Sequence, residues 1–259
     1  MNIIQKLSLI GSGNVATHLG KSLFAAGIKI DTVFSRNIDN ATELAEKIDS
    51  EPVNKIKNLS KNSDIYIFSV SDEAISPLAI MLSKYIGRHN RVVHTSGMVN
   101  SNVFKDLFDD YGVFYPLQTF TKNRELDISK VPFCITANNK NVENDLLTLA
   151  NKISTDVNII KDKERMKLHV AAVFVNNFTN FMYSIGKDIT EKEKLDFGLL
   201  FPLMEETTAK VLEGYNPESI QTGPAVRSDE NTVRQHLKYL KKFPKYMKVY
   251  KILTELIMK

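Results

Sequence analysis

Short apolar runs alternate with amphipathic segments through the first half of the chain. The apolar runs predict strands at residues 6–10, 29–35, 64–70, 91–95, 111–115, 131–137 and 157–160. The segments between them have helical periodicity and predict helices at residues 14–26, 38–48, 72–85 and 141–153. Strands that alternate with helices at this spacing need crossover connections. The pattern therefore predicts an α/β Rossmann fold with a doubly wound, mostly parallel sheet.

After residue 160 the alternation ends, and the rest of the chain has helical periodicity. Helices are predicted at residues 164–186, 197–212, 228–240 and 246–258, with breaks at Gly186 and at residues 214–217 and 243–244. We therefore expect an α/β domain over residues 1–161 and an all-α domain over residues 162–259, packed closely with a cleft between them. Ligands of such proteins bind preferentially in that cleft and at the carboxyl ends of the strands.

The composition is that of an ordinary globular protein and argues against several classes. The 259 residues are 43% hydrophobic and 25% charged, with a formal net charge of +4, which is unlike a disordered or fibrous chain. The basic residues are spread along the chain, so we expect no nucleic-acid partner. Cys134 is the single cysteine, and no Cys/His set has the spacing of metal ligands. We therefore expect neither a disulfide nor a metal site.

The sequence carries no signal for export or membrane insertion. Residues 1–6 lead straight into the first predicted strand, without a basic region or a cleavage site. The longest apolar stretches fall far short of the about 20 residues that a membrane span needs. Together with the single cysteine, this predicts a cytoplasmic protein in a reducing compartment, with no membrane partner.

A glycine-rich turn between the first strand and the first helix is the strongest local motif. It reads Gly11-Ser12-Gly13-Asn14-Val15-Ala16, which is the spacing of the dinucleotide-binding fingerprint. Gly11 permits the tight turn, Gly13 lets the backbone approach a pyrophosphate, and Ala16 lets the helix pack closely on the strand. The helix N-terminus offers free N–H groups to that anion. These six residues predict a dinucleotide site, and the alternative is an ordinary tight turn.

The end of the second predicted strand indicates which nucleotide is bound. NAD sites usually present Asp or Glu there, whereas this strand ends in Ser35 and Arg36. A guanidinium suits a 2′-phosphate through its charge and planar fork, and the Ser35 hydroxyl can add a hydrogen bond. We therefore expect NADP(H) to be preferred over NAD(H). The alternative is that Arg36 is simply solvated where the strand ends.

Two further strand ends are expected to flank the nicotinamide ring. Val70 and Ser71 end the third predicted strand and begin the following turn, and Thr95, Ser96 and Gly97 lie at the end of the fourth. Small polar groups and a glycine suit a place where a ring lies close to the backbone. Asp72 equally suits a helix N-cap. His94 is either a catalytic proton donor or a partly buried histidine whose hydrogen bonds are satisfied.

Motifs along essentially the whole chain resemble one family. They are GSGNVA at 11–16, SVSDEAI at 69–75, HTSG at 94–97, FYPLQTF at 114–120, LHVAAVFVNNFTN at 168–180 and QTGPAVRSD at 221–229. The chain resembles the bacterial Rossmann-like proteins with a DUF2520 C-terminal domain, which are described as NADP or coenzyme F420-dependent NADP oxidoreductases. These are similar in architecture to pyrroline-5-carboxylate reductase and to 6-phosphogluconate-dehydrogenase-like proteins. The resemblance implies that fold firmly and a reaction only loosely, because fold does not fix function.

One position departs from the family pattern. Tyr115 stands where many relatives carry a histidine before Pro-Leu-Gln. If that histidine serves as a proton donor, a phenol in its place needs retuning, because its ordinary pKa is much higher. The sequence therefore gives no firm basis for a catalytic role of Tyr115.

The helix predicted from residue 164 carries candidate substrate groups on one side. At about 100° per residue, His169, Asn176 and Asn180 share that side, and Asn177 lies near its boundary. No charged residue occurs between Leu168 and Gly186, so we expect this polar side to be covered. The resemblance implies His169 as a proton donor and Asn177 as a residue that orients the substrate. The alternative is a network of paired amides between helices.

The opposite side of the same helix is apolar and indicates self-association. It carries Val170, Phe174, Phe178, Phe181 and Ile185. A monomer would expose this stripe as a sizeable apolar patch, and such patches usually mark interfaces. We therefore expect a homodimer formed through the helical domain.

Two more polar residues are candidate substrate contacts. Arg227 follows Gly-Pro and precedes a predicted helix, where it could clamp a carboxylate with two hydrogen bonds. The alternative is that Arg227 pairs with a helix C-terminus or with Glu205 or Glu206. Gln118 is a polar group at a strand exit. The charge runs at residues 161–167 and 238–248 are typical of solvated helix faces, and we assign them no function.

The sequence as a whole favours a reductase that acts on a small molecule. A hydride would pass between NADPH and a carbonyl or imine carbon, with His169 or His94 supplying the proton and Asn177, Gln118 and Arg227 holding the substrate. The alternative is a nucleotide-binding sensor or adaptor without turnover. The family description suggests a third possibility, an F420-dependent NADP reductase, although no residue demands it.

Overall fold

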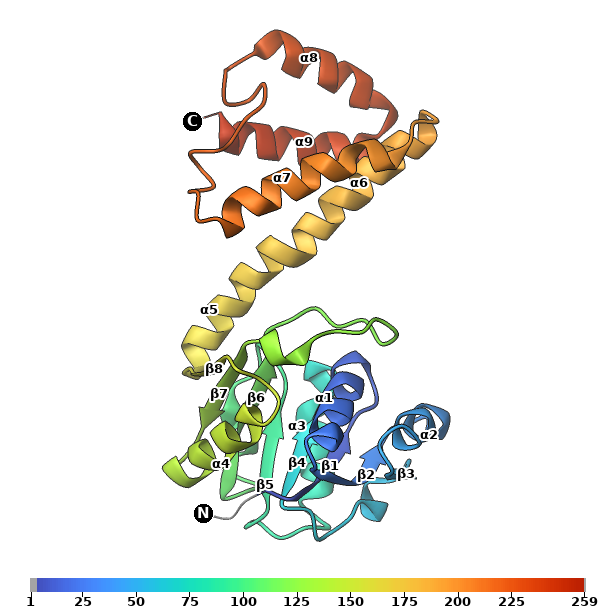
Figure 1. Cartoon of the computed structure of the whole chain (residues 1–259), viewed down its shortest axis with the longest axis vertical. Coiled ribbons are helices and arrows are strands. Elements are labelled where there is room, and N and C mark those ends of the chain that lie inside the picture. The colour runs from blue at the N-terminus through green and yellow to red at the C-terminus, as the bar shows by residue number, and fades with distance from the viewer. Residues whose placement is uncertain (1–3, 259) are drawn as a thin grey trace. The chain divides into compact units, whose positions relative to one another are not determined.

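The computed structural model describes residues 4–258, and its contacts divide the chain into two compact units, Met1–Asn176 and Asn177–Lys259. The first unit contains every strand that the structure describes, and the second is helical (Figure 1). The predicted α/β half and helical half therefore both exist. The helix after the last strand belongs by its contacts to the first unit.

The first unit is built on one eight-stranded sheet in the order β3-β2-β1-β4-β5-β6-β7-β8. All neighbouring strands are parallel except β6 and β7, which are antiparallel. The strands are β1 Lys6–Ile10, β2 Lys29–Phe34, β3 Glu51–Val53, β4 Ile65–Phe68, β5 Arg91–His94, β6 Asp110–Pro116, β7 Phe133–Ala137 and β8 Val157–Ile159. The prediction of a doubly wound, mostly parallel sheet is confirmed. The sequence missed β3, because three residues that include Pro52 carry no readable periodicity.

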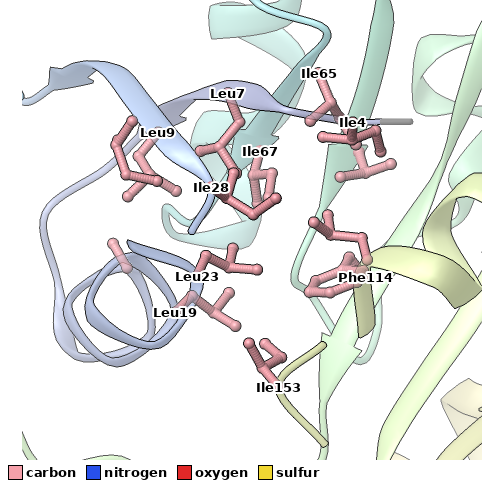
Figure 2. Close-up of a cluster of buried hydrophobic side chains, with 14 of the residues drawn as sticks. Ile4, Leu7, Leu9, Leu19, Leu23, Ile28, Ile65, Ile67, Phe114 and Ile153 are labelled. Carbon is pink, nitrogen blue, oxygen red and sulfur yellow. The ribbon is translucent and has the colours of Figure 1, made fainter. Parts of the chain in front are cut away.

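Helices cover both faces of this sheet and bury two apolar clusters. The larger cluster joins β1 and β4 to α1 Asn14–Ala25, α2 Ile38–Ala45 and α4 Lys140–Asn151. Leu19 and Leu23 of α1 and Phe114 of β6 all belong to this cluster (Figure 2). On the opposite face, the second cluster joins α3 Asp72–Leu82 to the sheet and to the short helix η2 Ser101–Phe104. The remaining short helices of this unit are η1 Ile56–Asn58 and η3 Ile128–Lys130.

A continuous helical segment leads out of the first unit. It consists of α5 Asp162–Ala172, a π-helix at Val173–Phe178 and α6 Thr179–Lys192. The prediction that Gly186 ends a helix is wrong, since Gly186 lies inside α6. A methyl group at Gly186 would lie 3.6 Å from Leu200 Cδ1, an ordinary contact. One glycine costs a helix only about 1 kcal/mol, so contacts to η5 Phe197–Leu200 can outweigh it.

The second unit continues with helices whose ends the sequence marks locally. They are α7 Phe201–Leu212, α8 Glu230–Tyr239, the short η6 Leu240–Lys242 and α9 Pro244–Ile257. Asp229 is the N-cap of α8 and accepts a hydrogen bond from the Thr232 N–H at 3.0 Å. Among the helices that the structure describes, none combines the length and the apolar character that crossing a membrane requires.

Candidate functional site

A cavity of about 1000 Å³ lies in the first unit, beyond the carboxyl ends of β1, β2, β4 and β5. Most of the predicted cofactor residues line it: Gly11, Ser12, Gly13, Asn14, Val15, Ser35, Arg36, Val70, Ser71, Thr95, Ser96 and Gly97. Of the predicted catalytic residues, His169 lines it as well. The other lining residues are Phe34, Ser69, Asp72, Glu73, Ala74, Pro77, Leu78 and Tyr115.

The glycine turn has the geometry of an anion cradle. Gly11 has a φ of +121°, and a Cβ there would lie 2.1 Å from the Ser69 carbonyl oxygen, so only glycine fits. A Cβ on Gly13 would meet nothing within 4 Å, which leaves room for a ligand beside the backbone. Gly13 caps α1 without a side-chain hydrogen bond, and the first turn of α1 contains no acidic residue. The start of α1 therefore suits the pyrophosphate of a dinucleotide.

Two residues of α1 tie this turn to the loop that follows β6. The Asn14 side chain donates to the Phe120 carbonyl at 2.9 Å, and His18 Nε2 lies 3.0 Å from the Thr121 carbonyl oxygen. Ala16 lies in the core, as predicted from close packing of helix on strand. The side chain of Gln118, in the same loop, is exposed and accepts from the Thr119 N–H. Gln118 is not among the residues that line the cavity.

Arg36 is a cation at the edge of this cavity, and it has no hydrogen bond or ion pair with any residue that the structure describes. The neighbouring Asn37 has a different task, because its side chain caps α2 by accepting from the Asp39 N–H at 2.9 Å. An exposed guanidinium without a protein partner can bind an anionic ligand at little cost. Ser71, which also lines the cavity, is the N-cap of α3. The suggestion that Asp72 is an N-cap is therefore wrong, because Asp72 is the first residue of the helix.

Tyr115 and His169 form a hydrogen-bonded pair in the wall of the cavity. The Tyr115 hydroxyl lies 3.1 Å from His169 Nδ1, and the two rings meet edge to face at 6.0 Å. The backbone of Gly97 lies directly against the pair, since a Cβ there would be 2.4 Å from Nδ1. Burial raises the pKa of Tyr115 to about 12, and Arg165 opposes this rise. With the phenol protonated, its O–H can donate to Nδ1, which leaves the ring proton on Nε2.

His94 is fully buried and is not among the lining residues. Its Nδ1 accepts from the Ser96 N–H at 3.1 Å, and its Nε2 has no hydrogen-bond partner among the described residues. Burial and, to a smaller extent, the Arg165 cation lower the pKa of His94 to about 3, against smaller opposing effects of Asp162 and the Asn100 backbone. His94 is therefore neutral near pH 7. The alternative of a partly buried histidine with satisfied hydrogen bonds is met at Nδ1 but not at Nε2, and the ring is fully buried.

Asn177 and Arg227 belong to the second unit. The prediction that His169, Asn176 and Asn180 share one helix side rests on a regular spacing of 100° per residue, and the π-helix at Val173–Phe178 interrupts that spacing. Arg227 is exposed and forms no ion pair with a described residue, while Glu206 pairs with Lys210 at 2.8 Å. The suggested pairing of Arg227 with Glu206 is therefore not formed.

No group of three or more His, Cys, Asp or Glu residues in the described part of the chain could hold a metal ion. The cavity instead presents an uncapped helix start, a cation and a Tyr–His pair in one wall. These features suit an anionic dinucleotide and a reaction that needs one proton.

Two sequence families match the chain. The one described as “NADP oxidoreductase coenzyme F420-dependent” matches residues 6–96, and the one described as “Domain of unknown function (DUF2520)” matches residues 131–257. A Bacteroides fragilis protein of known crystal structure, named “putative NADP oxidoreductase”, is 37% identical, with 98% of each chain covered and a TM-score of 0.94. The chain belongs to the DUF2520 NADP oxidoreductase family. The family resemblance of the sequence motifs is confirmed.

More distant structures share the fold of this family. The imine reductase from Myxococcus stipitatus in complex with NADP⁺ is 14% identical, covers 97% of this chain and 92% of its own, and has a TM-score of 0.70. The pyrroline-5-carboxylate reductase from Coxiella burnetii is 14% identical, covers 99% of both chains and has a TM-score of 0.61. At these identities the likeness concerns the fold alone. No curated protein matches the chain.

Proposed function

We propose that the protein is an NADP(H)-dependent oxidoreductase that transfers a hydride between nicotinamide and a small carbonyl or imine substrate. One observation carries the proposal: a single cavity joins Arg36, the Gly11–Gly13 turn and the Tyr115–His169 pair. A nucleotide that lies along this cavity has its phosphates at the turn and a proton donor in the same wall. The descriptions of the matching family and of the imine and pyrroline-5-carboxylate reductases support this reaction class.

The residues around the cavity divide into groups that would hold different parts of the nucleotide. The start of α1 binds the pyrophosphate through free backbone N–H groups. Arg36 and Ser35 bind the 2′-phosphate, which is the reason to prefer NADP(H) over NAD(H). Pro77 and Leu78 supply an apolar wall. The turn formed by residues 95–97 gives the nicotinamide ring a close approach to backbone.

His169 supplies the proton that completes the reduction. Bound NADPH provides the hydride. A histidine that gives up a proton must be in its imidazolium form, in which Nδ1–H donates to the Tyr115 hydroxyl oxygen and Nε2–H is free for the substrate. The hydrogen bond to Tyr115 orients the ring, and loss of the Nε2 proton returns the neutral imidazole. Imidazole is the side chain best suited to exchange a proton near neutral pH. Because His94 is buried and neutral at that pH, it is not in the imidazolium form that a proton donor needs, and we do not retain it as the donor.

Gln118, Asn177 and Arg227 are the proposed substrate contacts. Asn177 would orient the reacting group, and Arg227 would bind an anionic group of the substrate. Support for the two residues of the second unit comes from the motifs shared with the family and from the unpaired state of Arg227 among the described residues. For Gln118, support comes from its place in the loop that Asn14 holds.

The decisive experiment is a calorimetric titration of the protein with NADPH and NADH, repeated on Arg36→Ala. We expect NADPH to bind at least 10-fold more tightly than NADH, and we expect Arg36→Ala to remove that difference, since a charge-assisted phosphate contact contributes about 1.5–3 kcal/mol. The matched control is Lys21→Ala, an exposed cation on α1 outside the cavity lining. Failure of the wild-type protein to bind either nucleotide would refute the proposal.

A screen of carbonyl and imine substrates then separates two functions. Steady oxidation of NADPH with any of them supports the oxidoreductase. Tight NADPH binding without turnover across the panel would favour a nucleotide-binding sensor. In that case the cavity binds a regulatory nucleotide, and the Tyr115–His169 pair has no chemical task.

We also propose that two copies associate through the helical unit. Large apolar side chains are exposed there, including Leu199, Phe201, Leu203 and Leu212. Such a surface is unfavourable in water and fits a second copy of the same chain. Light scattering should give twice the 29.3 kDa of the chain. Leu203→Asp should shift the mass toward one copy, whereas Phe24→Asp on α1 should not.

A further inference from the structure

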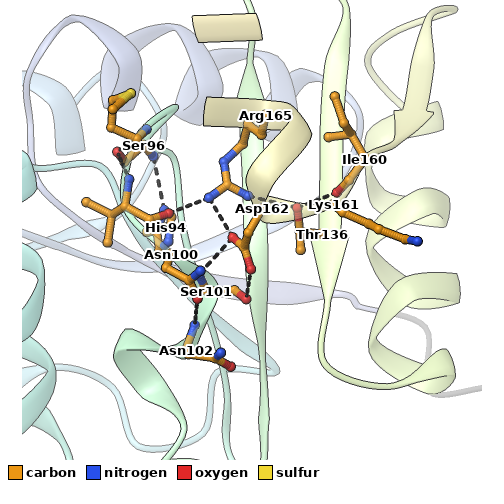
Figure 3. Close-up of polar contacts among 12 residues, drawn as sticks. His94, Ser96, Asn100, Ser101, Asn102, Thr136, Ile160, Lys161, Asp162 and Arg165 are labelled. Atoms are coloured by element: carbon orange, nitrogen blue, oxygen red, sulfur yellow. Dashed lines mark hydrogen bonds and ion pairs between the residues drawn. The ribbon is translucent and has the colours of Figure 1, made fainter. Parts of the chain in front are cut away.

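Arg165 is a fully buried cation one helical turn before His169 on α5. Its guanidinium pairs with Asp162 at 2.7 Å and donates to the Thr136 hydroxyl at 2.8 Å (Figure 3). It also donates to the Val99 carbonyl. Asp162 in turn accepts from the backbone N–H and the hydroxyl of Ser101, at 2.9 and 2.6 Å. A buried guanidinium costs much solvation, and these three partners offset part of that cost, while Nε has no partner among the described residues.

The sheet register explains how these partners meet. His94 of β5, Val113 of β6 and Thr136 of β7 are register partners, so they form one row across the sheet. Thr136 at the end of this row is bonded to Arg165, and the charge of Arg165 also acts on His94. Arg165 therefore ties α5 to β7 and, through Val99, to the loop that follows β5.

The same loop carries the glycine against which His169 packs. Ser96 holds the turn from within, because its hydroxyl accepts from the N–H groups of Met98 and Val99 at 3.0 Å each. The Ser96 N–H is bound to His94 Nδ1, which fixes the start of the turn. Gly97 lies between these two anchors. Its backbone lies so close to His169 that a Cβ would clash with the ring.

Arg165 and His169 lie on the same face of α5. Asp162, Arg165 and His169 are spaced by three and four residues, so they lie on one face of α5. Asp162 accepts a hydrogen bond from Ser101, and Arg165 donates one to Thr136 of β7. His169 contacts Gly97 and Tyr115. A shift of α5 would move His169 away from both.

We propose that Arg165 is a positioning residue that locks α5 to the turn after β5 and so holds His169 against Gly97 and Tyr115. The proposal deepens and rests on the proposed function, in which His169 donates the proton. Arg165 itself lies outside the residues that line the cavity. Its effect on the reaction passes through the placement of His169.

The test uses Arg165→Lys, which keeps the charge and loses the planar fork with its several donors. The first readout is the ¹⁵N resonance of His169 Nδ1, observed in protein labelled at its 5 histidines and assigned with His169→Gln. We expect the shift of Nδ1 in Arg165→Lys to move toward the value found in Tyr115→Phe, where its hydrogen bond is absent. This readout needs no substrate, so it tests the positioning independently of the proposed function.

The second readout is turnover. A displacement of about 1 Å can cost about 100-fold in rate, so we expect kcat of Arg165→Lys to fall about 10- to 100-fold while the NADPH Kd changes by less than about 3-fold. The matched control is Arg91→Lys, a nearly buried arginine of β5 that pairs with Asp110 and Asp145 away from the cavity. Arg91→Lys should leave the His169 resonance and kcat unchanged.

Three outcomes are informative. A wild-type His169 resonance in folded Arg165→Lys would overturn the proposal. A displaced resonance together with a wild-type protein that turns over nothing would support the positioning and refute the proposed function. If Arg165→Lys does not fold, Thr136→Val and Ser101→Ala remove one anchor each, and a wild-type resonance in both would overturn the proposal.

Discussion

Each unit of the protein contains one histidine hydrogen-bonded to a tyrosine, and the two pairs differ in their surroundings. Tyr115 and His169 lie 3.1 Å apart in the cavity wall, with ring centroids 6.0 Å apart. His236 and Tyr250 lie 2.8 Å apart, with centroids 5.6 Å apart, and both pairs are edge to face. The first is part-buried and the second is exposed. The geometry of a Tyr–His pair therefore does not by itself distinguish a functional site. What distinguishes Tyr115–His169 is the cavity, the contact of His169 with the Gly97 backbone and the anchoring of α5 by Arg165.

We expect the largest difference in kcat between the two pairs when the histidine of each is replaced by alanine. We expect His169→Ala to lower kcat by about 10²- to 10⁴-fold, the usual contribution of a general acid, with little change in NADPH binding. His236→Ala should leave kcat unchanged, because that pair lies outside the cavity lining. Steady-state kinetics on both variants measure the difference. Equal kcat values would remove His169 from the mechanism.

A methyl group placed against the Tyr115–His169 pair should have the next largest effect on kcat. Gly97→Ala places a Cβ within 2.4 Å of His169 Nδ1 and 3.0 Å of Tyr115 Cζ, so the rings must move. We expect a loss of about 100-fold in kcat, as for a displacement of about 1 Å. Gly214→Ala in the second unit is the control for fold, although its φ of +93° makes it strained as well. Full activity in Gly97→Ala would mean that the contact with the backbone is irrelevant.

Removing one hydroxyl should have a smaller effect. Tyr115→Phe keeps the ring but loses the hydrogen bond to Nδ1. We expect about a 10-fold lower kcat, from a lost hydrogen bond of about 1 kcal/mol or slightly more. Tyr250→Phe should have no effect.

The same residue makes a prediction about pH. Since the pKa of Tyr115 is raised to about 12, its phenol stays protonated in the folded protein while the unfolded chain begins to ionise near pH 10. The contribution of the Tyr115 phenol to the free energy of unfolding is therefore fully present below about pH 10 and is lost as the pH rises toward 12. Tyr115→Phe should lack that alkaline loss in urea unfolding, and an identical loss in both proteins would contradict the assignment.

The last prediction concerns the stability contributed by His94, the buried histidine that contrasts with His169. Its folded pKa of about 3 lies below the ordinary value of 6.5, so the unfolded chain takes up a proton first as the pH falls. Stability from the neutral ring is present above about pH 6.5 and decreases toward pH 3, by at most about 1.4 kcal/mol per pH unit. His94→Asn should reduce this slope between pH 6.5 and 4. An unchanged slope would show that His94 is accessible to protons.

Local sequence patterns predicted much of the fold and the nucleotide-binding part of the candidate site. Apart from β3 and the short helices η1, η2 and η3, the strands and helices of the first unit followed from apolar periodicity, and the Gly11–Gly13 turn followed from residue spacing between a strand and a helix. These features depend on neighbours in the chain, so a sequence records them directly. Gly186 was misjudged for the opposite reason, because contacts from a later helix keep α6 intact.

The sequence alone determined an α/β unit followed by helices, a dinucleotide-type turn and a candidate cation at Arg36. Tertiary structure decided the rest. Tyr115 and His169 are 54 positions apart, and antiparallel β7 and the entry of α5 bring them together. Arg165 lay in a charge run that resembled a solvated face, yet it is buried. A sequence gives charge and period, whereas burial, pairing and pKa depend on which distant groups surround a side chain once the chain has folded.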